Sequence, residues 1–254
     1  MKKLLKEYDQ ILFSGHVYTL YIFFRRKFID PKITPLSKVA RQNFGQIQRL
    51  HFFQSAQIYL QVNRIDGIYL EFGSHGLNTF RMALNTLGSY NKPNKIFKFI
   101  AFDSFEGMPE PEGIDAQKIW KKSMNFTTLE SFKTTMKLDL HRVEAVKGFY
   151  NVTLPSYNFD VNHKIALAYI DCDYYSSTRD VLEFLKDKIS HGTILAFDDW
   201  DCYYADPKRG QRLAFDEFKN ETFNLFSFEI FKTIDSGGMS FICHEKNKVG
   251  QAIL

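Results

Sequence analysis

The sequence predicts an α/β fold: a mostly parallel sheet with helices on both faces. From residue 66 onward, short apolar runs typical of buried strands alternate with helix-like stretches. Strand and helix in regular alternation imply right-handed crossovers and therefore parallel strands covered on both faces. The tail at 226–245 differs, because two alternating runs flank Gly237 and Gly238. This pattern predicts a closing antiparallel hairpin.

The elements can be assigned in chain order. Residues 1–60 are expected to be a helical extension, because apolar and aromatic positions recur at steps of three and four and the stretch IDPKITP interrupts them. The main domain is then 61–254. Its predicted strands, in order, are 67–73, 95–103, 142–148, 164–171 and 192–199. The predicted helices are 77–87, 128–140, 176–188 and 211–220.

Composition narrows the class of protein. The chain has 254 residues, 44% of them apolar, so it can bury a sizeable core. Its net charge of +4 comes without a dense basic block, which argues against nucleic acid as a partner. The three cysteines form no CxxC pair, so we expect no zinc site, no disulfide framework and a cytoplasmic location. The apolar run at 11–24 falls short of the ~20 residues of a membrane span.

Acidic residues follow two of the predicted strands. Asp171 ends the run IALAYID, Asp173 lies two residues further on, and Asp198 and Asp199 end GTILAFDD. Each aspartate alone would be read as a cap of the next helix or turn. Several at two strand ends would instead repel one another unless a cation lies among them, and oxygen ligands suit Mg²⁺. The sequence therefore predicts a metal site at Asp171, Asp198 and Asp199, with Asp173 free to act as a base.

The stretch YLEFGSHG has the features of a ligand-binding turn. Gly73, Ser74, His75 and Gly76 lead from a strand into a helix, and such a turn lets a ligand approach the backbone closely. Two glycines alone would also fit an ordinary tight turn. Glu71 before them favours a ligand with an ammonium group, which it would hold directly or through its neighbours.

The next two strand ends extend the predicted ligand site. Asp103 lies where nucleotide-binding sheets place an acid against ribose hydroxyls, although it could instead cap its turn through the Ser104 and Phe105 amides. The loop at 115–126 is a candidate lid. Gly148 follows the third strand, a common place for adenine contacts.

Four stretches of the sequence together resemble the macrocin O-methyltransferase family. They are AFDSFEGMPEP, KGFYNVTLP, AYIDCDYYSSTRDVLEFL and the pair HGTILAFDDW and GQRLAFDEF, and the similarity extends from about residue 67 to 218. The resemblance implies a Rossmann-like class I methyltransferase fold with seven strands, the last of them antiparallel. It also implies metal-dependent transfer of a methyl group from S-adenosylmethionine (SAM) to a sugar hydroxyl.

The resemblance also implies roles for single residues. Glu71, Gly73 and Gly76 would form the turn at the methionine end of SAM, Asp103 would bind the ribose, and Ser104 and Phe105 would lie near the adenine. Asp171, which also faces the cofactor, Asp198 and Asp199 match the metal ligands, and Asp173 matches the general base. One difference is that GSHG is shorter than the family's loop and lacks its arginine, so His75 or Arg81 would have to grip the SAM carboxylate. The first sixty residues would shape the acceptor pocket and, with their many aromatic residues, contribute to a homo-oligomer.

Two functions from other classes remain open on the sequence alone. The stretch DCD also fits the DxD metal motif of a glycosyltransferase that uses a nucleotide sugar as donor. A non-catalytic scaffold of a polysaccharide-assembly complex is the other alternative. A glycosyltransferase would not need the turn after Glu71, and a scaffold would not need the carboxylates at 171–199.

Overall fold

The structure is a computed structural model. It describes residues 36–88, 96–118, 120–137, 139–158, 164–235 and 237–250, and for 36–44 it describes the backbone alone. The first 35 residues of the predicted helical extension lie outside the described residues. No helix in the described ranges is both long and apolar enough to cross a bilayer.

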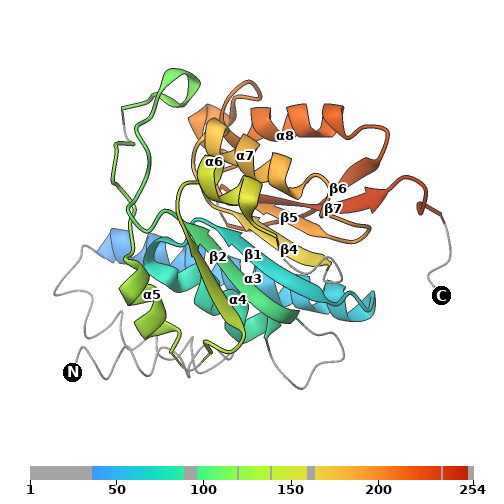
Figure 1. The fold of residues 1–254 in the computed structure, drawn as a ribbon, viewed down its shortest axis with the longest axis horizontal. Coiled ribbons are helices and arrows are strands. Elements are labelled where there is room, and N and C mark those ends of the chain that lie inside the picture. The colour runs from blue at the N-terminus through green and yellow to red at the C-terminus, as the bar shows by residue number, and fades with distance from the viewer. Residues whose placement is uncertain are drawn as a thin grey trace.

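The core of the fold is a seven-stranded sheet of order β3-β2-β1-β4-β5-β7-β6 (Figure 1). Five parallel strands come first in the chain: β1 (Gly67–Phe72), β2 (Ile96–Asp103), β3 (Val143–Lys147), β4 (Ile165–Ile170) and β5 (Ile194–Phe197). The last two, β6 (Phe226–Thr233) and β7 (Met239–Glu245), pair with each other in antiparallel fashion, and β7 pairs likewise with β5. The predicted fold class and the closing hairpin are confirmed.

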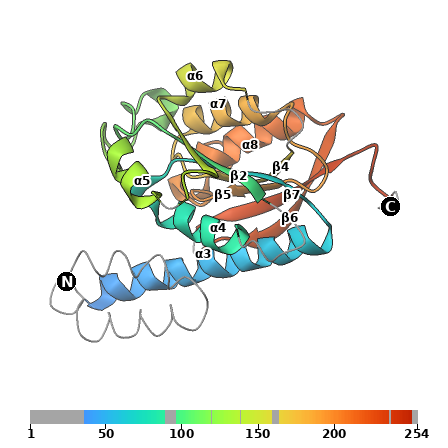
Figure 2. The same cartoon turned by 60° about the horizontal axis from the view of Figure 1, so that its bottom comes forward.

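Helices cover both faces of the sheet (Figure 2). One layer consists of α3 (Leu36–Val62), α4 (Asn78–Leu87) and α5 (Leu129–Thr135), and the other of α6 (Tyr150–Thr153), α7 (Tyr175–Leu185) and α8 (Gly210–Glu221). Alternate residues along each strand point to opposite faces. On β4, Tyr169 therefore belongs to the core under the first layer, while Ile170 belongs to the core under the second.

The second half of α3 is part of the main core. Phe52 and Phe53 are at most 1% exposed, and the Phe53 ring stacks on Tyr169 with 5.6 Å between ring centroids. Tyr69 of β1 contacts Phe53 edge-on at 6.2 Å. Burial of two phenylalanines contributes a few kcal/mol of folding free energy. This helix therefore packs on the sheet within the same core, and the boundary expected near residue 60 does not separate two cores.

The order of the strands changes direction between β1 and β4, and ligands bind at such a point in open α/β sheets. Gly73 follows β1 here, and its amide donates to the Phe102 carbonyl at 2.9 Å. Its φ is +93°, and a Cβ at this position would lie 1.8 Å from the Asp171 carbonyl oxygen. Glycine thus lets the chain after β1 lie directly against the chain after β4.

Replacement of Gly73 is expected to be severely destabilising. In Gly73→Ala the new methyl collides with backbone, which cannot rotate away as a side chain can, so we expect a loss of roughly 3 kcal/mol or more in the free energy of unfolding. Chemical denaturation measures it. The matched control is Gly113→Ala, which also has a positive φ (+55°) but no atom within 4 Å of the new Cβ. Equal losses in both variants would contradict the proposed collision.

Candidate active site

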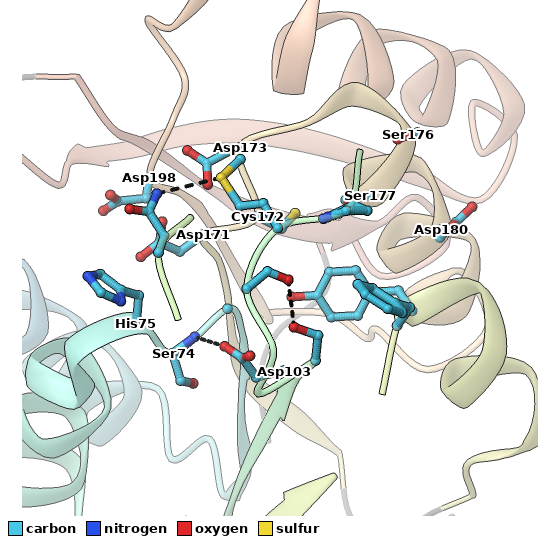
Figure 3. Close-up of a pocket in the computed structure, with 18 of the residues that line it drawn as sticks. Ser74, His75, Asp103, Asp171, Cys172, Asp173, Ser176, Ser177, Asp180 and Asp198 are labelled. Carbon is cyan, nitrogen blue, oxygen red and sulfur yellow. Dashed lines mark hydrogen bonds between the residues drawn. The ribbon is translucent and has the colours of Figure 1, made fainter. Parts of the chain in front are cut away.

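A cavity of about 870 Å³ lies at the carboxyl ends of β1, β2 and β4. This volume is in the usual range for ligand pockets. Figure 3 shows the carboxylates of Asp171, Asp173 and Asp198 together on one side and Ser74 with Asp103 on the other. The residues in the lining that were predicted from sequence are Gly73, Ser74, His75, Gly76, Asp103, Ser104, Gly148, Asp171, Asp173 and Asp198.

Glu71 lies outside the lining, so of the two modes expected for it, direct contact with a ligand or contact through its neighbours, the structure favours the second. Its side chain is fully buried and accepts hydrogen bonds from the Tyr69 hydroxyl at 2.5 Å and the Ser74 hydroxyl at 3.0 Å. Burial raises the pKa of Glu71 to about 8, although the two hydrogen bonds favour its charged form. Glu71 therefore orients Ser74 from beneath the turn. Phe105 is also buried outside the lining, against Phe132.

Asp103 combines the two roles considered for it. One carboxylate oxygen accepts from the Ser74 amide at 2.7 Å, and the other accepts from the Phe105 amide at 2.6 Å. It thus joins the turns after β1 and β2, as a capping residue does. Burial raises the pKa of Asp103. Because a carboxylate has about four acceptor positions, each oxygen can still accept a ligand hydroxyl.

The structure brings the predicted metal ligands together. Oxygen atoms of Asp171, Asp198 and Asp199 all lie within 4.8 Å of one another. Asp199 accepts from the backbone amide of Asp173 at 2.9 Å and donates its own amide to Gln211 at 2.9 Å, so the loops after β4 and β5 are bonded together. Asp173 has a φ of +59°. This left-handed conformation is tolerated by aspartate and asparagine better than by most residues.

The half-buried acids perturb one another. Burial and then repulsion from Asp198 raise the pKa of Asp173 to about 7. Burial, followed by the neighbouring carboxylates, raises the pKa values of Asp171 and Asp199 well above the ordinary range. No described residue donates a hydrogen bond to the Asp171 carboxylate. A divalent cation would reverse these shifts because it favours the charged forms.

One cation beside this cluster is a side chain of the protein itself, the guanidinium of Arg49, which was not predicted from the sequence. Arg49 reaches from α3 to Asp198, with Nε to Oδ1 at 3.1 Å and Nη2 to Oδ2 at 2.7 Å. Nη2 also lies 2.9 Å from Oδ2 of Asp235, in the β6–β7 connection. Burial acts to lower the pKa of Arg49, but its anionic neighbours outweigh this and raise it, so the guanidinium stays charged. Arg49 is bonded to one carboxylate of this cluster and to Asp235, and within the described ranges it makes no hydrogen bond to Asp171, Asp173 or Asp199.

The donor set at 171–199 fits a divalent cation. Three carboxylates with no sulfur or nitrogen ligand suit Mg²⁺ or Mn²⁺, which take oxygen ligands and keep some water. These half-buried carboxylates also repel one another, and a bound cation would relieve that repulsion. Asp171, Asp198 and Asp199 would hold it.

The predicted lid is anchored at the rim of the cavity. The Asp115 carboxylate accepts from the amides of Tyr175 at 2.7 Å and Ser176 at 3.2 Å, so it caps α7. Trp120 packs edge-on against Tyr174 and Tyr203, with centroids 5.7 and 5.2 Å apart. These contacts hold Asp115 and Trp120 against the start of α7.

Of the two side chains suggested for the SAM carboxylate, His75 and Arg81, His75 alone lies in the cavity lining. His75 lines the cavity, and its Nδ1 lies 3.3 Å from the Phe126 carbonyl oxygen. Arg81, the other residue suggested by sequence, lies on α4 outside the lining. The lining also contains Gln46 and Arg49 of α3 and the group Ser176, Ser177, Arg179 and Asp180 of α7. The sequence around Gln46 and Arg49 does not distinguish them from the polar residues that a helix commonly exposes to solvent, so their place in the lining could not be predicted.

A seven-stranded 3-2-1-4-5-7-6 sheet with a glycine turn, an acid after β2 and acids after β4 and β5 defines a class I methyltransferase. The model of the macrocin-O-methyltransferase (TylF) family matches residues 34–238. The chain belongs to this family and is therefore an O-methyltransferase. A comparison with curated proteins found no match.

Solved structures of other O-methyltransferases share the fold. CalS11, the calicheamicin methyltransferase, matches with a TM-score of 0.64 and 21% identity, over 88% of this chain and 90% of its own. A second CalS11 structure, in the apo state, is described as a TDP-rhamnose 3′-O-methyltransferase (TM-score 0.56, 21% identity, 88% and 92% covered). The O-methyltransferase NovP matches with a TM-score of 0.59 and 23% identity, over 77% and 79%. TomG from Streptomyces achromogenes, solved in complex with SAM, matches with a TM-score of 0.50 and 11% identity, over 76% of this chain and 79% of its own. Family membership decides against the glycosyltransferase and the scaffold.

Proposed function

We propose that this enzyme transfers the methyl group of SAM to a hydroxyl group of a sugar, with a divalent cation bound at Asp171, Asp198 and Asp199. One observation carries the proposal: these three carboxylates converge within 4.8 Å beside the cavity that also contains the glycine turn and Asp103. The TDP-rhamnose activity of CalS11 and the SAM complex of TomG support the two substrates.

The two ends of the cavity would hold the two substrates. The turn at 73–76 and Asp103 would bind SAM, with Asp103 accepting from the ribose hydroxyls through its free acceptor positions. Gly148 and Ser104 would line the adenine end. The acceptor would lie over Asp171 and Asp173, beneath Gln46 and Arg49 of α3.

The chemical difficulty is that a sugar hydroxyl is a poor nucleophile at neutral pH. When bound, SAM supplies an electrophilic methyl group, and a divalent cation lowers the pKa of hydroxyl groups that coordinate it. Asp173 lines the cavity two residues beyond Asp171, so its carboxylate would take the hydroxyl proton. The walls around both groups fix their orientation and exclude part of the water.

The direct test is methyl transfer from SAM, with Mg²⁺, to a panel of sugars that includes TDP-rhamnose and free glycosides. The site of the new methyl group would be located by NMR. Binding of a nucleotide sugar without any binding of S-adenosylhomocysteine (SAH) would overturn the proposal.

Binding of the cofactor is expected to depend on Asp103. Asp103→Ala removes the acceptor for the ribose and also frees the Ser74 and Phe105 amides, so we expect SAH affinity to fall at least ~10-fold and the melting temperature to drop. Calorimetry with SAH measures the first effect. Asp139→Ala is the matched control, because its carboxylate bonds Arg142 and neither residue lines the cavity. Unchanged SAH affinity in Asp103→Ala would exclude Asp103 as a cofactor ligand.

A further inference from the structure

Arg49 is the cationic side chain that links α3 to the carboxylate cluster. Its own side chain is 19% exposed and that of Asp198 is 9% exposed, so the pair is largely shielded from water. Both bonds to Asp198 use the planar fork of the guanidinium, which fixes the plane of the carboxylate as well as its position. The fork connects residues 149 positions apart in the chain.

The hydrogen bonds on Asp198 leave little freedom for a metal. Oδ1 accepts from Arg49 Nε and from the Tyr169 hydroxyl, so its two acceptor positions are filled. Oδ2 accepts only from Arg49 Nη2 among the described residues. One position on Oδ2 therefore remains for a cation. Asp198 can bind through a single oxygen but cannot chelate through both.

Asp235 holds the other side of the guanidinium. Its Oδ2 lies 2.9 Å from Nη2, and its Oδ1 accepts the Gly237 amide at 2.9 Å. Arg49 is thus clamped between the end of β5 and the β6–β7 connection. A lysine at position 49 would keep the positive charge but would lose this two-pronged geometry.

We propose that Arg49 is a positioning residue that fixes Asp198 for one-oxygen binding of the divalent cation. The inference rests on the proposed function, because it assumes that a cation binds at the cluster. Arg49 acts through Asp198. Groups that hold metal ligands in place typically change metal affinity by 10–100-fold when they are altered.

The test compares Mn²⁺ binding by wild type, Arg49→Lys and Arg142→Lys in calorimetry, with the full chain. Arg49→Lys keeps a positive charge near the metal, so a loss of Mn²⁺ affinity would report on the changed orientation of Asp198. We expect Mn²⁺ affinity to fall about 10–100-fold in Arg49→Lys, while SAH affinity stays within about twofold. Arg142→Lys is the control: Arg142 also bonds an aspartate through Nε and Nη2, both to Oδ1 of Asp139, and is 15% exposed, but it lies outside the cavity lining. We expect it to bind Mn²⁺ like wild type.

Tyr169→Phe provides a second variant in case Arg49→Lys does not fold. It frees one acceptor position on Oδ1 and should alter Mn²⁺ affinity without changing any charge. Wild-type Mn²⁺ affinity in both Arg49→Lys and Tyr169→Phe would overturn the inference and leave the proposed function intact. Absence of Mn²⁺ binding by wild type would overturn both the metal role and this inference, whereas SAH binding would still test the methyl-transfer proposal separately.

Discussion

Asp173→Asn is expected to stop turnover while both ligands still bind. Asparagine is nearly isosteric, keeps the backbone amide that donates to Asp199, and tolerates the φ of +59° at this position. It cannot accept a proton, so we expect kcat to fall by about 10²–10⁴. Steady-state kinetics measure this loss, and calorimetry with SAH and Mn²⁺ checks that binding persists.

The matched control for the base is Asp201→Asn. Asp201 is the other acid close enough in sequence to be considered, but its carboxylate bonds Arg212 at 2.6 Å and lies outside the cavity lining. We expect its kcat to stay near the wild-type value. Near-wild-type turnover by Asp173→Asn, or a collapse in Asp201→Asn, would move the base away from Asp173.

Asp171→Asn is expected to abolish activity and, in EDTA, to raise the melting temperature. Asp171 is half-buried; burial, followed by its like-charged neighbours, raises the pKa of its carboxyl, and no described residue donates a hydrogen bond to it. Removing its charge should gain about 1 kcal/mol without metal, or ~2–4 °C. Wild type should instead gain about 2.7 kcal/mol from Mn²⁺ at a hundred times its Kd, a gain that the variant loses.

Thermal melting with EDTA and with Mn²⁺ measures both effects. Asp216→Asn serves as the control, because Asp216 is an exposed residue of α8 paired with Lys219. We expect it to keep the wild-type response to Mn²⁺. Full wild-type activity in EDTA, or an undiminished Mn²⁺ shift in Asp171→Asn, would remove the metal from the mechanism.

The strand ends were predictable because their signal is local. Asp171 and Asp198 each end an apolar run, and parallel strands bring such ends to one edge of the sheet. Their convergence follows once β4 and β5 are neighbours. The same reasoning located Gly73 and Asp103 correctly in the cavity.

The position of Glu71 follows from the alternation of side chains along β1 and not only from its place at the strand end. Residues two apart in a strand share a face, so Glu71 lies on the side of Tyr69, whose hydroxyl bonds it beneath the turn. The alternation was visible in the sequence, but the depth of burial was not. Arg49 could not be found this way, because its partners depend on how α3 crosses the sheet. No pattern within α3 encodes a partner 149 positions away.

The clamp on Arg49 also bears on biogenesis. Its three members come from α3, the turn after β5 and the β6–β7 connection, so the clamp is complete only after residue 235 has been synthesised. Contacts between such distant residues form late, because the intervening chain must first be ordered. A nascent chain that stops before β6 would expose its carboxylates without Asp235 and without the strand that flanks β5. We therefore expect Asp198 to reach its final orientation only after the β6–β7 connection has folded against α3.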